Sequence, residues 1–138
     1  MANRFNVKIP VTENPKEKEI AAVHVKELAA NDYETEVIAA TLPVVLDFYA
    51  TESKACEELA PRFAAVAEKF AGKVRFMKIL RQSNAELAAK LGVTGNPTLV
   101  FFKDGTERGE RLSGEDIKRT ALKAQVEALL GRPAAPSA

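Results

Sequence analysis

The residues with the clearest chemical potential are Ser53 and Cys56, which stand three positions apart at the start of a long helical pattern. Two thiols at this spacing can carry two electrons. The first thiolate attacks a substrate disulfide, and the second releases the product by closing an intramolecular disulfide. Cys56 is the only cysteine among the 138 residues. The two-electron cycle therefore cannot run within one chain, and any sulfur chemistry must use a single thiol.

Other catalytic or metal-binding arrangements lack necessary parts. A nucleophilic serine needs a base, yet the only histidine is His24, in a segment that predicts a strand far from Ser53. Serine is also among the best N-cap residues, which favours a structural role for Ser53 at the start of the next helix. One cysteine and one histidine are too few for the usual zinc sites, so we expect no metal and no other cofactor.

Two further residues, Cys56 and Asp47, allow more than one interpretation of their role. Cys56 falls in the first turn of a predicted helix, where unpaired backbone amides favour a thiolate. A reactive thiol here would form a mixed disulfide with a partner, a glutathione adduct or a Cys56-linked dimer; the alternative is a small, buried, inert thiol. Asp47 lies inside an apolar run, and such a carboxylate costs stability unless it is hydrogen-bonded, paired or protonated.

Length and charge restrict the class of protein. A chain of 138 residues fits one domain with an ordinary core. Its 20 basic and 19 acidic residues give a formal charge of +1, which provides no broad surface for nucleic acid or anionic lipid. The amino terminus has no apolar run of signal-peptide length, and no window approaches the roughly 18 apolar residues of a membrane span. We expect a cytoplasmic protein that binds neither nucleic acid nor membranes.

The elements that must position these residues alternate along the chain. The apolar run over 43–50 predicts a central strand buried on both faces, and the spacing after it predicts an amphipathic helix, kinked at Pro61, that stops at Gly72. The other predicted elements are a strand over 22–27, a helix from Asn31 to Ala40 with a capping box of Asn31 and Glu34, a strand over 74–80, a helix capped by Ser83 that ends at Gly92, a strand over 97–102 with a hairpin partner over 107–112, and a helix over 115–130.

This order predicts an α/β fold, in which a central mixed sheet of four to five strands is flanked by helices on both faces. Around this domain, which we assign to residues 21–131, the composition predicts two less structured segments. We expect residues 1–20 to form a partly flexible N-terminal extension and residues 132–138 to form a disordered tail.

Several short motifs follow one another at fixed spacing. They are Asp47–Ala50 on the central strand, Cys56 five residues before Pro61, Lys78, Gly92–Val93, Gly95–Leu99, Lys103–Gly105 and Gly114. Over roughly Val23 to Leu130, the chain resembles the thioredoxin family. The resemblance implies the thioredoxin fold, a cis peptide bond before Pro97, and a groove where Gly95 and Asn96 offer backbone groups to an extended peptide.

The departures from the family pattern concern the same region. The family's Trp-Cys-Gly-Pro-Cys is replaced here by residues 52–56, Glu-Ser-Lys-Ala-Cys, so only the second cysteine survives. Asn96 replaces the usual apolar residue before the proline, and Arg81 and Gln82 stand where an acidic turn is common. A few members of the protein disulfide isomerase group that carry Ser-x-x-Cys are regarded as binding proteins.

Candidate site residues follow from the resemblance. In the family, a buried acid and a lysine at the positions of Asp47 and Lys78 move protons for the second thiol, so the catalytic candidates are Cys56, Asp47 and Lys78. The partner-binding candidates are Glu52, Ser53, Lys54, Gly95, Asn96 and Pro97.

Three hypotheses for the function remain open. The first is a redox-impaired, chaperone-like or adaptor-like protein that holds a protein or extended peptide between Ser53 and Pro97 and contributes to thiol-disulfide homeostasis. The second is a monothiol oxidoreductase acting through Cys56. The third is a dithiol enzyme in which Ser53 is an engineered replacement for cysteine. On the first two hypotheses, two-electron reductase activity is not expected.

Overall fold

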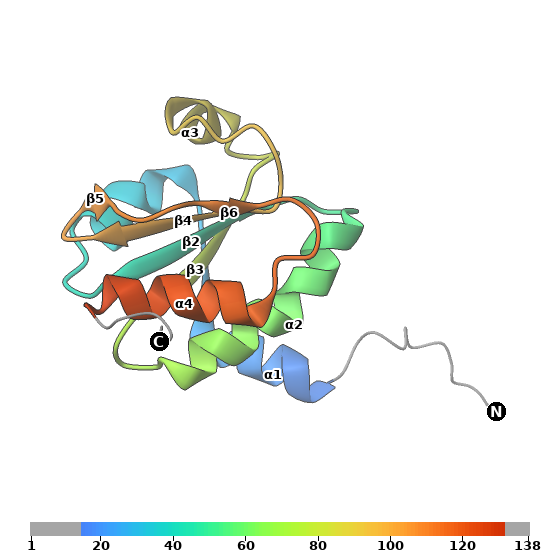
Figure 1. Ribbon diagram of the computed structural model, residues 1–138. Helices are drawn as coiled ribbons and strands as arrows, with labels where there is room; N and C mark the ends of the chain where they lie inside the picture. Colours follow the sequence, from blue (N-terminus) through green and yellow to red (C-terminus); the bar gives the residue numbers. More distant parts are fainter. Residues whose placement is uncertain (1–14, 132–138) are drawn as a thin grey trace.

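The computed structural model describes residues 15–131, and it describes side chains from residue 19 onward (Figure 1). The elements are α1 (Pro15–His24), β1 (Val25–Leu28), η2 (Ala30–Asp32), η3 (Glu34–Ile38), β2 (Val44–Tyr49), α2 (Lys54–Lys69), β3 (Arg75–Leu80), α3 (Ala85–Lys90), β4 (Thr98–Lys103), β5 (Thr106–Glu107), β6 (Leu112–Ser113) and α4 (Arg119–Leu129).

The sheet has the strand order β1-β3-β2-β4-β5, and β6 also pairs with β4. Strands β1, β3 and β2 run parallel to one another, whereas β4 runs antiparallel to β2, so the predicted mixed sheet is confirmed. Within residues 15–131 it has six strands rather than four to five. The return strand predicted over 107–112 is divided into β5 and β6, with Gly109 between them in a left-handed conformation at a φ of +75°.

Helices cover both faces of the sheet, as predicted (Figure 1). Successive side chains of a strand point to opposite faces, and β2 shows the consequence. Val45 packs among residues of α2 and α4, whereas Leu46 packs among residues of η3 and α3. The same alternation places Asp47 on the α2 face, two positions after Val45. The sheet therefore directs this carboxylate toward the helix that carries Cys56.

The amino-terminal part differs from the sequence prediction. The predicted strand over 22–27 begins only at Val25, because α1 continues through His24. Good helix formers dominate this segment, and a proline is tolerated in the first turn of a helix. His24 is half-buried at the end of α1 and is not a solvent-facing strand residue, while Val23 is 75% exposed. Residues 1–14 and the predicted tail over 132–138 lie outside the described residues.

The capping box predicted for Asn31 and Glu34 is also wrong. The Asp32 carboxylate accepts a hydrogen bond from the Ala29 N–H at 3.0 Å, so the turn begins two residues earlier than predicted. It continues as a 3₁₀ turn followed by a π-helical turn instead of a regular α-helix.

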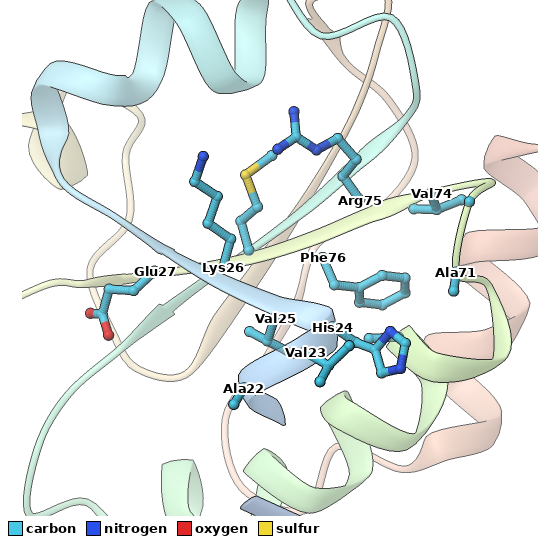
Figure 2. A pocket seen from close by; sticks show the side chains of 13 residues that line it. Ala22, Val23, His24, Val25, Lys26, Glu27, Ala71, Val74, Arg75 and Phe76 are labelled. Carbon is cyan, nitrogen blue, oxygen red and sulfur yellow. The ribbon is translucent and has the colours of Figure 1, made fainter. Parts of the chain in front are cut away.

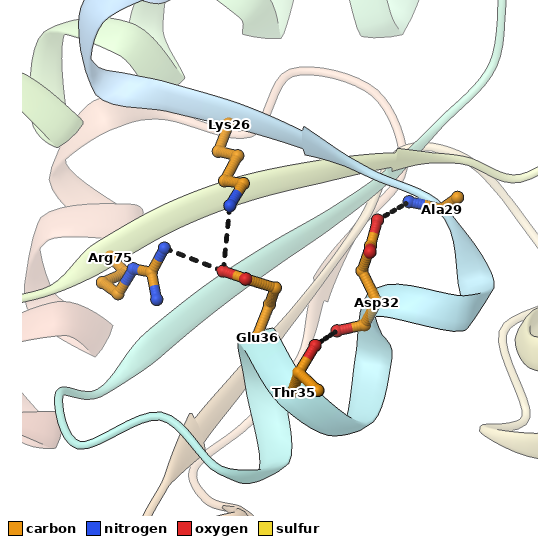
Figure 3. A network of polar contacts seen from close by, with 6 residues as sticks. All are labelled: Lys26, Ala29, Asp32, Thr35, Glu36 and Arg75. Atoms are coloured by element: carbon orange, nitrogen blue, oxygen red, sulfur yellow. Dashed lines mark hydrogen bonds and ion pairs between the residues drawn. The ribbon is translucent and has the colours of Figure 1, made fainter.

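Ionic contacts fix this irregular segment to the sheet. The Glu36 carboxylate lies 3.1 Å from Lys26 Nζ on β1 and 3.0 Å from Arg75 Nη2 on β3 (Figure 3). Hydrogen bonds from Lys26 and then Arg75 lower the pKa of Glu36. This contact joins η3 to the two strands at one edge of the sheet.

Two other helix starts differ from the prediction. The N-cap of α3 is Asn84 rather than Ser83. Helix α4 begins at Arg119 instead of near Glu115, because Gly114 and Asp116 have φ values of +89° and +61° that a right-handed helix does not allow.

Candidate functional site

The predicted site residues meet at one end of the sheet. Strand β2 ends at Tyr49, and the antiparallel β4 begins at Thr98, which pairs with Phe48. The loop that enters α2 and the loop that enters β4 therefore lie at the same sheet end (Figure 1). We call this region the Ser53–Pro97 face; it comprises residues 50–54 and 94–97.

Ser53 is the N-cap of α2, as predicted. Its Oγ accepts a hydrogen bond from the Cys56 N–H at 3.3 Å, and its φ of −120° is extended. His24 borders a cavity together with Ala67 and Ala71, at the opposite end of α2. A helix of 16 residues is about 24 Å long, so His24 cannot serve Ser53 as a base.

Cys56 is buried in the first turn of α2, with 8% of its surface exposed. Its sulfur faces the end of β2, where the Ala50 N–H donates a hydrogen bond to Sγ at 3.4 Å. A backbone N–H that points at the sulfur stabilises negative charge there. Burial, however, restricts the access of a second sulfur atom, which must reach Sγ in any exchange reaction.

Asp47 is buried, with 6% of its surface exposed. Its Oδ1 has no hydrogen-bond partner among the described residues. Burial raises the pKa of Asp47 to about 7, and the positive charge of Lys78 opposes part of this rise. The carboxyl group is consequently able to accept or release a proton near neutral pH.

Lys78 lies on β3, the middle one of the three parallel strands. It is in register with Asp47 on one side and with Glu27 on the other. Its Nζ lies 4.0 Å from Glu27 Oε1 and 5.1 Å from the centre of the Tyr49 ring. Tyr49 donates a hydrogen bond to Glu27, and burial followed by this bond raises the pKa of the tyrosine. Lys78 therefore lies between a buried and a half-exposed carboxylate.

The turn after β3 binds the loop before Pro97. Arg81 Nη1 donates to Asn96 Oδ1 at 3.1 Å, and Arg81 Nη2 donates to the Thr94 carbonyl at 3.0 Å. The Arg81 backbone is itself fixed, because its N–H donates to the Tyr49 carbonyl at 2.8 Å. Two residues that depart from the family pattern, Arg81 and Asn96, are thus direct partners.

The next residue of this turn binds the other loop. Gln82 Oε1 accepts hydrogen bonds from the Thr51 N–H at 2.9 Å and from the Thr51 hydroxyl at 3.2 Å. One turn consequently connects both loops of the Ser53–Pro97 face. The exposed side chains of Glu52 and Lys54 flank Ser53, and Glu52 has a φ of +58°.

The peptide bond between Asn96 and Pro97 is cis, as the family resemblance predicted. Pro97 is buried, and its carbonyl accepts a hydrogen bond from the Gly114 N–H at 3.2 Å. Among the described residues, neither the N–H nor the C=O of Asn96 has a hydrogen-bond partner. The backbone next to the proline is therefore free to pair with another chain.

Two cavities lie away from this face. One of about 560 Å³ is bordered by the end of α1, β1 and the start of β3, where His24, Lys26 and Arg75 line it (Figure 2). Another of about 390 Å³ lies between Pro61, Arg62 and Arg119. Within the described residues, no cluster of three or more histidine, cysteine or acidic side chains could hold a metal ion, and no helix is long and apolar enough to cross a membrane.

Comparison with known proteins agrees with this arrangement. A family model for thioredoxin matches residues 24–128. The chain belongs to the thioredoxin family. It is 30% identical over 105 residues to a thioredoxin of Pseudomonas aeruginosa, an alignment that covers 76% of this chain and 95% of that protein. Family membership and the mixed sheet together confirm the predicted thioredoxin fold.

A plant member of the thioredoxin family is also similar. The chain is 31% identical over 110 residues to thioredoxin M4, chloroplastic, of Arabidopsis thaliana, covering 80% of this chain and 56% of that protein. The alignment with thioredoxin X, chloroplastic, of the same plant spans 58% of its length. The chain thus spans little more than half of these two relatives.

Sequence reasoning missed several contributors to the site. Glu27 was not a candidate, although it contacts both Lys78 and Tyr49. Arg81 and Gln82 were recognised as departures from the family, but their partners in the two loops were not predicted. The available signal was that both unusual residues fall in one turn directly after a buried strand.

Proposed function

We propose that this thioredoxin-family protein binds an extended segment of a partner protein at the Ser53–Pro97 face, without a two-electron dithiol cycle. The observation that carries the proposal is the Asn96 backbone beside Pro97, which has no hydrogen-bond partner among the described residues, on a face next to which the Cys56 sulfur is buried. The role is adaptor-like or chaperone-like and linked to thiol-disulfide homeostasis. A cytoplasmic location is part of the same proposal.

Backbone pairing is the mode of binding that these contacts support. The proline disfavours helical conformations of the residue before it and favours extended ones, in which the Asn96 N–H and C=O can pair as those of a strand residue do. An extended peptide can add to such a residue by the hydrogen bonds of a sheet, in which affinity comes from the main chain. The partner's cysteines are not needed for this contact.

The contacts that Ser53 and Cys56 already make disfavour sulfur chemistry. Ser53 Oγ is used as the cap of α2 and has no base beside it. Cys56 Sγ is buried and hydrogen-bonded to the Ala50 N–H. A mixed disulfide at Cys56 would also lack an internal thiol to resolve it, because the chain has no second cysteine.

The test uses cysteine-free nine-residue peptides selected from a displayed random library on the full-length protein. In an antiparallel pair, the two residues of a hydrogen-bonded position exchange both of their bonds, while neighbouring N–H groups point away. Methylating each peptide nitrogen in turn should therefore abolish binding only at the position whose N–H donates to the Asn96 carbonyl. The ¹⁵N signals of Asn96 and its neighbours should shift on binding, with Gly109 as a distant control.

Two results would contradict the proposal. Selected peptides that tolerate N-methylation at every position, or that shift Gly109 and not Asn96, would exclude backbone pairing at this face. Turnover in insulin reduction at a rate near that of a dithiol thioredoxin would show that the redox cycle persists.

Monothiol exchange through Cys56 is the second candidate. It is supported by the Ala50 N–H that points at Sγ and by the proton-accepting range of Asp47. Asp47 would take the thiol proton, and the Cys56 thiolate would attack a disulfide and displace one of its two sulfurs as a thiolate. The mixed disulfide would persist until an external thiol such as glutathione attacked it and released Cys56.

The two candidates differ in their need for sulfur access. Monothiol exchange requires rapid alkylation of Cys56 by iodoacetamide in the folded protein and a glutathione adduct at that residue by mass spectrometry. A thiol that reacts only after unfolding would contradict this candidate and leave the binding proposal intact.

A further inference from the structure

Arg81 is a cation held at the Ser53–Pro97 face by neutral partners. Its guanidinium donates to the Asn96 side-chain oxygen and to the Thr94 carbonyl, and neither acceptor carries a charge. Its Nε is buried and has no hydrogen-bond acceptor among the described residues. No carboxylate lies within ion-pair distance of Arg81 among the described side chains. Its charge is fixed in place but not neutralised.

The charge of Arg81 lies beside the side chain of Asn96, the residue whose backbone N–H and C=O have no partner among the described residues. When two strands pair, the residues directly opposite each other project their side chains on the same face, with Cβ atoms about 5 Å apart. A partner residue paired with Asn96 would therefore place its side chain beside the Asn96 side chain. Because Arg81 Nη1 is 3.1 Å from Asn96 Oδ1, the partner's side chain would meet the guanidinium there.

We propose that the protein selects extended segments with an aspartate or glutamate opposite Asn96, and that Arg81 is the residue that binds this acidic side chain. The inference rests on the proposed function and adds a chemical preference to it. A carboxylate there would accept charge-assisted hydrogen bonds from donors that Asn96 and Thr94 already orient. Holding the guanidinium in advance reduces the conformational entropy lost when the partner binds.

The test compares selections from one nine-residue, cysteine-free random library on the wild type, Arg81→Glu and Arg108→Glu. Arg108 is exposed between β5 and β6, and its N–H pairs with the Phe101 carbonyl, three residues into β4 from the Thr98 end. Arg108→Glu therefore changes the net charge equally but away from this face. We expect aspartate or glutamate at one fixed position on the wild type and Arg108→Glu, and lysine or arginine there on Arg81→Glu.

Affinity measurements make the expectation quantitative. Replacing the selected glutamate by glutamine should weaken binding to the wild type about tenfold, since hydrogen bonds to charged groups carry that order of energy. The same replacement should leave the affinity of Arg81→Gln unchanged. Arg81→Gln also covers the case in which the charge reversal fails to fold, because it keeps a side chain able to donate to Asn96.

Several outcomes would overturn the inference. Wild type and Arg81→Glu could select the same residue, or the glutamine peptide could bind the wild type as well as the glutamate peptide. If N-methylation still abolishes binding at the position paired with Asn96 in that case, the proposed function stands and only the acidic preference is wrong. A concentration-dependent dimer that Arg81→Glu dissociates would assign the face to a second copy of this chain and would also overturn the inference.

Discussion

The site has two layers that are built by different means. The interior layer consists of Asp47, Lys78 and Cys56, whose positions are set by strand register and by the first turn of α2. The outer layer consists of the loops around Ser53 and Asn96, which side-chain hydrogen bonds from one turn hold together. The interior contains the catalytic candidates that the family resemblance implied, and the outer layer contains the departures from the family pattern that the sequence indicated.

The two layers differ in what constrains their residues. Interior residues are constrained by the core: a buried carboxylate such as Asp47 affects the stability of the whole fold. Outer residues such as Arg81 and Asn96 are held by side-chain hydrogen bonds, and each such bond contributes about 1 kcal/mol to stability. A substitution in the outer layer is therefore expected to cost less stability than one in the interior.

The largest expected effect comes from Ser53→Cys, which returns a second thiol to the retained interior. We expect this variant to catalyse the reduction of insulin by dithiothreitol, because an internal thiol can resolve the mixed disulfide. Wild type and Ser53→Ala should stay at the uncatalysed rate. If Ser53→Cys were as inactive as Ser53→Ala, the interior residues Asp47, Lys78 and Cys56 would not support disulfide exchange.

Asp47 should give the next largest effect, in the pH dependence of stability. Its folded pKa of about 7 lies above the ordinary value of 3.8. The folded state therefore holds this proton more tightly than the unfolded state does. The resulting stabilisation is complete below pH 4 and is lost as the pH rises through 7. Relative to Asp47→Asn, the wild type should lose about 4 kcal/mol of unfolding free energy between pH 4 and pH 8.

Urea unfolding at one-unit pH intervals measures this difference. Glu58→Gln is a suitable control, because Glu58 is an exposed carboxylate on α2 without an ion pair among the described side chains. Its pH profile should parallel that of the wild type. Parallel profiles for Asp47→Asn and the wild type would mean that Asp47 is not the buried titrating group we describe.

Ser53 should have a smaller effect, limited to the helix start. Ser53→Ala removes the bond to the Cys56 N–H and should lower the unfolding free energy by about 1 kcal/mol, whereas Ser53→Asp should retain the cap. Ser83→Ala is the matched control, because α3 is capped at Asn84. An equal loss in the two alanine variants would argue against Ser53 as a structural cap.

Gln82 should have the smallest effect on stability and a local effect on the loop. Gln82→Ala removes the acceptor of the Thr51 N–H, so hydrogen exchange of that amide should accelerate while stability falls by about 0.5 kcal/mol. Gln125→Ala deletes a comparable acceptor of the Glu110 N–H elsewhere and should leave Thr51 unchanged. Unchanged Thr51 exchange in Gln82→Ala would remove one of the two connections between the outer loops.

The interior layer could be predicted from sequence because its signals are local. An apolar run on both sides of Asp47 indicates burial, and a serine three residues before Cys56 indicates a helix cap. The cis bond before Pro97 was predicted only through the family resemblance. The segment before β1 was less accessible to this reasoning: α1 was not predicted, although its composition favours a helix.

The outer layer could not be predicted because its contacts join residues distant in sequence. Arg81 and Asn96 are 15 positions apart, and Gln82 and Thr51 are 31 positions apart. Periodicity describes one element at a time and does not indicate which loop a turn contacts. The bond between Tyr49 and Glu27 likewise depends on strand register, which a single sequence does not reveal.

The most direct test of the account is the affinity of a selected cysteine-free peptide for the wild type and for Cys56→Ala, measured by isothermal titration calorimetry on folded protein. The account predicts dissociation constants that agree within about twofold, because binding uses the Asn96 backbone and not the sulfur. Loss of binding in Cys56→Ala, or retention only of cysteine-containing peptides as covalent adducts, would contradict it.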